Sequence, residues 1–268
     1  MIARVAIAGF GAIGRVVAEA LDRGIDGLQL AAVSARDTAR AEQAMAGFAR
    51  PVPVLPLALL GEDAAIVVEC APAALLRGIA EPALAKGRTL VVLSCGALLD
   101  NFDLVDLARR QGGRILVPTG ALLGLDAVQG AAQGVIARVH MITRKPPNGL
   151  AGAPYLIEHG ISLDGLDRAL RVFTGNAREA ARGFPANVNV AAALALAGIG
   201  PDRTTIEIWA DPAVSRNTHQ IEVEADSVRL TMQIENVPSA ENPKTGRLTP
   251  LSVIALLRKL ASPLAIGT

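Results

Sequence analysis

The sequence has few cysteines and no excess of charge of either sign. Its two cysteines, Cys70 and Cys95, lie far apart without the paired spacing of a zinc site, so they indicate neither a metal centre nor a disulfide framework. The 26 basic and 25 acidic residues leave a formal net charge of +1, which provides no long-range field to attract nucleic acid or an anionic membrane. We therefore expect a small-molecule partner and no metal.

Long hydrophobic runs are also missing, although 51% of the residues are hydrophobic. The runs fall short of the roughly 20 apolar residues that a membrane-spanning helix needs. The first residues, MIARVAIAGFGAIG, have neither the basic region nor the long apolar region of a signal peptide, because glycines interrupt the apolar run. We expect a soluble, cytoplasmic protein, and the low cysteine content fits that reducing compartment.

Short apolar runs recur through the first part of the chain, and helix-like segments separate most of them. The runs are Ala3–Ala8, Leu28–Val33, Ala65–Cys70, Thr89–Leu93 and Arg114–Val117. They are apolar throughout rather than alternating, as is typical of parallel strands that helices cover on both faces. The pattern predicts an α/β domain with a Rossmann-type, doubly wound parallel sheet.

The pattern changes after about residue 120, where apolar and polar residues alternate with period two. The alternating segments are Arg138–Arg144, Thr205–Ala210, Thr218–Glu224 and Val228–Glu235. They predict a second, α+β domain built on a mixed or antiparallel sheet with one covered face. We expect a dinucleotide-binding domain of residues 1–119 together with a C-terminal helix at 247–268, and a substrate or catalytic domain of residues 120–246.

A glycine-rich turn follows the first apolar run and opens a helix with an apolar stripe. Gly9, Gly11 and Gly14 match the pattern G-x-G-x-x-G. The first glycine permits a tight turn, the second lets the backbone approach a pyrophosphate, and the third lets the helix pack closely on the strand. The backbone amides of Ala12 and Ile13, at the positive end of the helix dipole, would face the negative charge. This context favours a dinucleotide site over a glycine-rich turn without a ligand.

The second apolar run ends at the position where NAD-binding proteins commonly place an acidic residue on the cofactor ribose. This chain has Ser34 and Arg36 there, with the acid displaced to Asp37. Ser34 and Arg36 could meet a 2′-phosphate, so we expect NAD or NADP, although Arg36 as a solvated surface residue remains an alternative. Cys70 and Ala71, at the end of the third run, are expected to line the cofactor site.

Of the three histidines, His219 has the position most typical of a catalytic residue. It begins an alternating strand directly after a polar turn, and strand ends beside loops commonly present reactive groups. His140, within a strand, and His159, before a glycine, are interpreted as structural or solvent-facing. Cys95 is a candidate thiol nucleophile, but it has no adjacent base in the sequence, which favours inert packing.

Three basic residues are candidates for holding a substrate carboxylate. Arg144 and Lys145 lie in the segment TRKPP, and Lys244 lies in ENPKT. Arginine offers a planar fork and lysine a point charge for a carboxylate. Ordinary surface charge is the alternative interpretation of all three.

These motifs occur together in one known family: the chain resembles the L-aspartate dehydrogenases along essentially its whole length. The segments that carry the resemblance are GFGAIG at 9–14, SCGA at 94–97, PTGA at 118–121 with GLD at 124–126, TRKPP at 143–147, FPANVNV at 184–190, DP at 211–212 through NTH at 217–219, NVP at 236–238 and ENPKT at 241–245.

The resemblance implies oxidative deamination of L-aspartate to oxaloacetate and ammonia through iminoaspartate, with NAD or NADP as hydride acceptor. Iminoaspartate can alternatively supply nicotinamide cofactor synthesis, and the family leads us to expect a homodimer. The family's catalytic histidine corresponds to His219. Its cofactor-contacting alanine and asparagine correspond to Ala121 and Asn189, with Asn187 competing for the second role. The chain departs from the family pattern near Ser34, where the acidic residue that would bind the ribose is missing. The resemblance therefore does not imply exclusive use of NAD.

Alternative functions also fit a two-domain dinucleotide-binding protein. One is a sugar, semialdehyde or dihydrodipicolinate-type dehydrogenase or reductase, and another is a module that senses dinucleotide without turnover. The sugar enzymes carry Glu-Lys-Pro after a Rossmann strand, where this chain has VECAP and LSCGA without a lysine. A semialdehyde dehydrogenase would need Cys95 as its nucleophile, and a sensor usually needs a DNA- or protein-binding segment.

Overall fold

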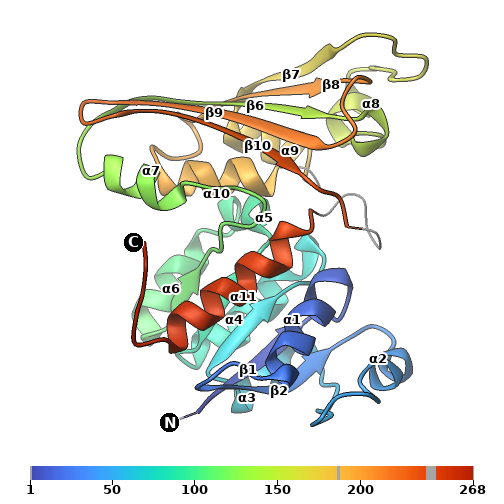
Figure 1. Ribbon diagram of the computed structural model, residues 1–268, viewed down its shortest axis with the longest axis vertical. Coiled ribbons are helices and arrows are strands. Elements are labelled where there is room, and N and C mark those ends of the chain that lie inside the picture. Colours follow the sequence, from blue (N-terminus) through green and yellow to red (C-terminus); the bar gives the residue numbers. More distant parts are fainter. Residues whose placement is uncertain (1, 186–187, 240–245, 268) are drawn as a thin grey trace. The chain divides into compact units, whose positions relative to one another are not determined.

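The computed structural model describes residues 2–185, 188–239 and 246–267, which divide into two compact units. The first unit contains residues 1–120 and 249–266, and the second contains residues 121–248 and 267–268. Figure 1 shows the elements of both units along the chain. Within the described residues, no helix is both long and apolar enough to cross a membrane.

The first unit is built on a parallel sheet of five strands. These strands are β1 (Ala3–Ala8), β2 (Leu28–Ser34), β3 (Ile66–Glu69), β4 (Thr89–Val92) and β5 (Arg114–Leu116). They lie in the order β2-β1-β3-β4-β5 and all pair in parallel. The predicted Rossmann-type sheet is therefore confirmed. The order reverses between β1 and β3, and open parallel sheets bind their ligands at the carboxyl end of such a reversal.

Helices connect these strands and cover the sheet. They are α1 (Ala12–Arg23), α2 (Thr38–Ala44), α3 (Leu60–Asp63), α4 (Leu76–Ala85), α5 (Cys95–Leu99), α6 (Asp103–Gln111) and α11 (Leu248–Ala261). The stripe of α1 buries Val17 and Leu21 against β1, in the same core as Val253 and Leu257 of α11. The end of the chain thus completes the core around the strand that leads into the glycine-rich turn.

The second unit is built on a mixed sheet, as the alternating segments predict. Its strands are β6 (Ile136–Lys145), β7 (Leu170–Asn176), β8 (Thr205–Ala210), β9 (Asn217–Ala225) and β10 (Arg229–Asn236). They lie in the order β10-β9-β6-β8-β7, and only the neighbours β6 and β8 run parallel. Buried and more exposed residues alternate along β6, β8 and β9, so the sheet has one buried face and one more exposed face.

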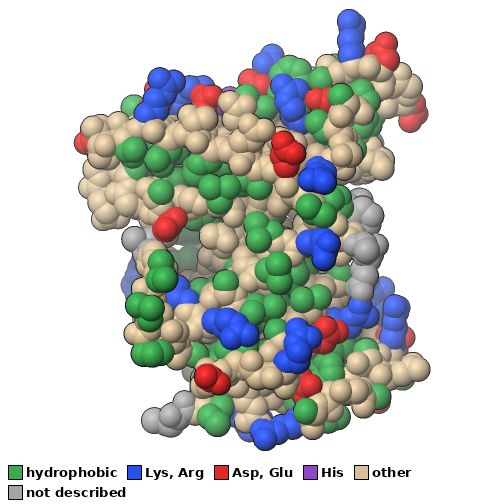
Figure 2. All heavy atoms as spheres, viewed as in Figure 1, with side chains coloured by type: hydrophobic (Ala, Val, Ile, Leu, Met, Phe, Trp, Pro, Cys, Tyr) green, Lys and Arg blue, Asp and Glu red, His purple; other side chains and the backbone are tan. Residues whose placement is uncertain are grey.

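Helices of the second unit cover one of these faces. They include α7 (Leu125–Ala131), α9 (Ala177–Gly183) and α10 (Asn189–Ala197), which lie along the sheet in Figure 1, and a shorter α8 (Pro154–Glu158). The covered face is apolar over most of its length, with the cross-strand pairs Val139–Val223 and Met141–Ile221. On the visible surface of the molecule, charged side chains of both signs are scattered among other residues (Figure 2).

Candidate active site

Two of the three turn glycines are required by packing within the protein. Gly9 has a φ of 102°, and a Cβ there would lie 2.6 Å from the carbonyl oxygen of Cys70 and 2.8 Å from the nitrogen of Ala71. A Cβ on Gly14 would overlap the carbonyl oxygen of Gly9 and lie 3.0 Å from Cγ2 of Ile7. These glycines bring the turn against the end of β3 and α1 against β1, as the motif predicts.

Gly11 differs, because no part of the protein requires a glycine there. Its backbone is extended, with φ −92° and ψ −157°, and a Cβ would meet nothing within 4 Å. Gly11 is also the N-cap of α1, and no side-chain hydrogen bond caps this end of the helix. The first amides of a helix have no partners within it. An open backbone surface leading to an uncapped helix end fits the pyrophosphate of a dinucleotide.

The ends of three neighbouring strands are tied together beside this turn. The amide of Gly9 donates to the carbonyl of Ser34 at 3.0 Å, and the amide of Cys70 donates to the carbonyl of Ala8 at 2.7 Å. The structure therefore brings the turn, the end of β2 and the Cys70–Ala71 segment together at the reversal in strand order. Predicted cofactor contacts from three separate motifs lie at one edge of the sheet.

The displaced acid at the end of β2 has a structural role. Asp37 is the N-cap of α2, and its carboxylate accepts a hydrogen bond from the amide of Arg40 at 3.0 Å. Ser34 is buried at the end of the strand, whereas Arg36 is exposed. An exposed guanidinium at this strand end is the kind of group that accommodates a 2′-phosphate. This arrangement leaves both NAD and NADP open as cofactors.

Glu69, a fully buried carboxylate at the end of β3, was not predicted from the sequence as part of the site. It accepts hydrogen bonds from the amides of Leu93 and Ser94, at 3.0 and 2.9 Å, and from the hydroxyl of Ser94 at 3.0 Å. Burial raises the pKa of Glu69 despite these donors. The carboxylate joins the end of β3 to the turn after β4. The signal in the sequence was an acidic residue near the end of an otherwise apolar run.

Cys95 lies beside this buried carboxylate and is not arranged as a nucleophile. Burial, with the charge of Glu69, raises the pKa of Cys95 to about 12, and the thiol lies 3.8 Å from the carbonyl oxygen of Val92 as a weak donor. The same two causes raise the pKa of Cys70. A thiol needs to become a thiolate to attack a carbonyl. The environment of Cys95 disfavours the semialdehyde dehydrogenase alternative.

The second unit contains a buried polar group at one end of its covered sheet face. His219 of β9 stands directly opposite Thr143 of β6, and its Nδ1 lies 3.1 Å from the hydroxyl oxygen of Thr143. The side chains are almost inaccessible, with exposed fractions of 2% for His219 and 4% for Thr143. Lys145, two residues along β6, points to the same face and is also buried. Thr143 was not predicted as a site residue, although the period-two alternation of a strand places it on the same face as Lys145.

Burial controls the charge of this group. It lowers the pKa of His219 to about 3, with a further contribution from the positive charge of Lys145, so the imidazole is neutral at physiological pH. Burial also lowers the pKa of Lys145 to about 8, so its amine changes charge close to neutral pH. A neutral imidazole offers one proton acceptor and one donor. The arrangement can accept a proton from a reacting group and bind an anion beside it.

Arg144 does not join this group, because neighbouring residues of a strand point to opposite faces. Its guanidinium stacks on the ring of Trp209 at 4.7 Å and pairs with Asp211 at 3.4 Å, on the face opposite to His219. The third basic candidate, Lys244, lies outside the described residues.

The two residues assigned by resemblance to the cofactor lie elsewhere in the second unit. Ala121 begins this unit, and its carbonyl accepts a hydrogen bond from the buried side chain of Asn236 at 3.0 Å. Asn189 is the first residue of α10 and is half-buried. The competing Asn187 lies outside the described residues.

The other two histidines are held by local contacts. His140 pairs through Nδ1 with the hydroxyl of Thr205 at 2.8 Å, on the face opposite to His219. The exposed His159 stacks on Tyr155 with 3.9 Å between ring centroids, and its Nδ1 lies 2.9 Å from the carbonyl oxygen of Tyr155. Each ring therefore has a partner within its own unit, away from the group around His219.

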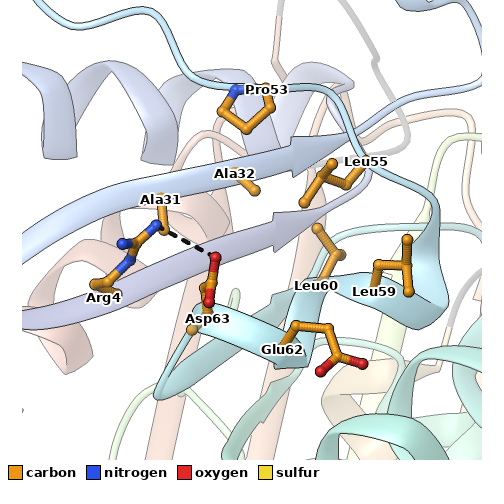
Figure 3. A pocket seen from close by; sticks show the side chains of 10 residues that line it. Arg4, Ala31, Ala32, Pro53, Leu55, Leu59, Leu60, Glu62 and Asp63 are labelled. Atoms are coloured by element: carbon orange, nitrogen blue, oxygen red, sulfur yellow. Dashed lines mark ion pairs between the residues drawn. The ribbon is translucent and has the colours of Figure 1, made fainter.

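A pocket in the first unit is unrelated to these candidates. Its lining includes Arg4 of β1, Leu55, and Leu60 and Asp63 of α3, and Arg4 pairs with Asp63 at 3.9 Å (Figure 3). The residues predicted to bind the cofactor are absent from this lining. Among the described residues, no cluster of three or more His, Cys, Asp or Glu side chains is placed to hold a metal ion.

Comparisons with known proteins cover nearly the whole chain. A model of the C-terminal region of aspartate dehydrogenases matches residues 126–260, and a model of the NAD-binding domain of homoserine dehydrogenases matches residues 9–118. The L-aspartate dehydrogenase of Bradyrhizobium diazoefficiens is 61% identical over 99% of this chain and 94% of its own. L-Aspartate dehydrogenase 3 of Bordetella bronchiseptica is 56% identical over 98% and 97%. The aspartate dehydrogenase structure from Thermotoga maritima has the same fold, with a TM-score of 0.76, 24% identity and full coverage of both chains.

Proposed function

Since the chain belongs to the L-aspartate dehydrogenase family, we propose that His219 is the proton-transfer residue with which it oxidatively deaminates L-aspartate. The protein is an NAD(P)-dependent oxidoreductase that converts L-aspartate to oxaloacetate and ammonia through iminoaspartate. The observation that carries the assignment of His219 is its place in a buried polar group with Thr143 and Lys145, on a sheet face that is otherwise apolar.

The first unit supplies most of the proposed cofactor site. Gly9, Gly11 and Gly14, with the amides of Ala12 and Ile13, would hold the pyrophosphate at the start of α1. The remaining proposed contacts are Ser34 and Arg36 for the ribose, Cys70 and Ala71 beside the turn, and Ala121 and Asn189 by family resemblance. When bound, NAD or NADP accepts the hydride from Cα of aspartate.

His219 handles protons in the hydrolytic half of the reaction. A water molecule adds to the imine carbon of iminoaspartate, and the neutral imidazole takes a proton from that water as the C–O bond forms. The imidazolium then returns the proton to the nitrogen. As the C–N bond breaks and ammonia leaves, the new hydroxyl group becomes the carbonyl of oxaloacetate and gives its proton back to the imidazole. The low pKa of His219 keeps its acceptor nitrogen free of a proton before the water attacks.

Lys145 is the basic residue that we assign to a substrate carboxylate. It is buried on the face of His219, whereas Arg144 lies on the other face and pairs with Asp211. An ammonium group held away from water interacts more strongly with an anion than one exposed to it. Lys244 remains a candidate through its place in the ENPKT segment. Binding by these lysines would hold aspartate with its Cα fixed for reaction.

We also propose that the enzyme works in the cytoplasm as a homodimer and that its iminoaspartate can supply nicotinamide cofactor synthesis. The family membership and the low cysteine content support these assignments. Light scattering of the purified protein tests the dimer, and a mass near 27.6 kDa, that of one chain, would contradict it. Fractionation of the source cells tests the compartment.

The substrate is tested by following reduced nicotinamide absorbance with L-aspartate, offering NAD and NADP in separate reactions. We expect turnover with aspartate and with at least one of the two cofactors. L-Homoserine, L-glutamate and D-aspartate serve as matched substrates that differ in one group or in configuration. Turnover of another amino acid without turnover of L-aspartate would overturn the substrate assignment. Tight binding of NADH without turnover of any substrate would favour a sensing module instead.

A further inference from the structure

Two threonine–histidine pairs cross the sheet of the second unit, one on each face. Thr143 and His219 form the pair on the covered face, with 3.1 Å between Oγ1 and Nδ1. Thr205 and His140 form the pair on the opposite face, with 2.8 Å between the corresponding atoms. Both pairs join directly opposite residues of neighbouring strands. The two pairs share residue types and cross-strand placement, but the hydroxyl of Thr205 also donates to the carbonyl of Val139 at 3.1 Å. Thr205 and His140 therefore serve as a control for a threonine–histidine pair away from the proposed site.

The covered pair is a polar interruption in an apolar row. The next two pairs along β6 and β9 on this face are Met141–Ile221 and Val139–Val223. Burying a hydrogen-bonded polar pair contributes little more to stability than an apolar pair of similar shape. Packing alone thus gives no reason for a hydroxyl at residue 143. Its hydrogen bond to the imidazole is the feature that an apolar residue could not supply.

The hydrogen bond matters because the ring of His219 is neutral. A neutral imidazole carries one proton, on either Nδ1 or Nε2, and the partner of one nitrogen decides which form is present. A hydroxyl can accept a hydrogen bond from Nδ1–H without the negative charge with which a carboxylate would raise the pKa of the ring. A ring held in this way has its free electron pair on Nε2.

We propose that Thr143 is a positioning residue whose hydroxyl accepts the Nδ1–H of His219, so that Nε2 is the atom that takes the proton from water. This inference rests on the proposed function for the identity of the reaction. The hydroxyl also fixes the plane of the imidazole, because a ring flip would remove Nδ1 from its partner. Without it, the ring would exchange between the two neutral forms.

Kinetics of three variants test this role. Thr143→Val keeps the shape of the side chain and removes the hydroxyl, and kcat is expected to fall roughly two- to tenfold, the value of one hydrogen bond. The KM for the cofactor is expected to stay the same. Thr143→Ser should restore most of the lost kcat, and Thr205→Val should leave kcat unchanged. An unchanged kcat in Thr143→Val, or an equal loss in Thr205→Val, would overturn the proposal.

Nitrogen NMR of the cofactor-free protein tests the hydrogen bond independently of activity. The chain has only three histidines, so His219 can be assigned by comparison with His219→Ala. We expect the proton on Nδ1 in the parent protein and a mixture of the two neutral forms in Thr143→Val. A proton on Nε2 in the parent, or identical spectra of the parent and Thr143→Val, would contradict the inference.

A double substitution separates positioning from a general structural effect. In the His219→Ala background, Thr143→Val should cause no further loss of kcat, because the side chain that it positions is gone. A further loss equal to that in the parent would refute the role. If His219→Ala itself keeps full activity, the proposed function of His219 fails, while the NMR comparison still decides whether Thr143 sets the ring's protonation.

Discussion

Gly11→Ala is predicted to weaken cofactor binding while leaving the fold intact. The added methyl group meets nothing within 4 Å in the protein, and the backbone at Gly11 is in an extended conformation that alanine adopts. Losing a glycine from the unfolded chain stabilises by about 0.4–1 kcal/mol, and alanine is a poorer N-cap by a similar amount. The two effects nearly cancel, so the free energy of unfolding should change by less than about 1 kcal/mol.

The effect on the cofactor is larger because the methyl group occupies the surface that the pyrophosphate would approach. Forcing one extra methyl into a close contact costs about 1–3 kcal/mol. The Kd for the reduced cofactor should therefore rise roughly 5- to 150-fold. The assay is a fluorescence titration of NADH and NADPH, combined with thermal unfolding of the cofactor-free protein. The same Kd as the parent would refute the placement of the pyrophosphate at this turn.

Two other glycines provide controls with opposite expectations. Gly78 lies in α4 with open space around it, so Gly78→Ala should raise the Tm and leave the Kd unchanged. In Gly14→Ala the new Cβ would overlap the carbonyl oxygen of Gly9, so this variant should lose about 1–3 kcal/mol of stability. If Gly11→Ala unfolds as readily as Gly14→Ala, its effect on the cofactor cannot be assigned to direct contact.

The remaining predictions concern catalysis, pH and cofactor choice. His219→Ala should lower kcat roughly 10²- to 10⁴-fold with cofactor binding nearly unchanged. His140→Ala should keep the parent kcat. Equal losses of kcat in the two variants would contradict the assignment of His219. Burial lowers the pKa of Lys145 to about 8, so its positive charge is present below that pH and lost above it. The value of kcat/KM for aspartate should therefore fall as the pH rises through 8. The variant Lys145→Met should lack this fall. Arg36→Ala should raise the KM for NADP and leave that for NAD unchanged, and equal effects on both would contradict contact with the 2′-phosphate.

The parallel sheet and the glycine turn were predictable because their signals are local. A fully apolar run flanked by helices indicates a strand buried on both faces, and the three glycines follow one such run directly. The role of Asp37 was less accessible, since an acid near the end of a strand fits a ribose contact and a helix cap equally well. Its hydrogen bond to the amide of Arg40 is what distinguishes the two.

The group around His219 depends on the pairing of distant strands, which alternation does not determine. Period two predicts that Arg144 and Lys145 point to opposite faces, but not which one shares a face with His219. That choice follows from the register that places Thr143 opposite His219. The parallel pairing of β6 with β8 was likewise outside the reach of the pattern, because it depends on the connection through β7, α9 and α10. The role of Glu69 depends on the pairing of β3 with β4, because that pairing brings its carboxylate to the amides that follow β4.

The central claim, that this enzyme removes a hydride from Cα of L-aspartate and releases its nitrogen, is tested most directly with L-aspartate deuterated at Cα. The reaction should slow with the deuterated substrate under conditions in which hydride transfer limits the rate, and the deuterium should appear on the reduced nicotinamide. Reduced cofactor, ammonia and oxaloacetate should form in equal amounts. Reduced cofactor without the deuterium, or formed without ammonia, would contradict the account.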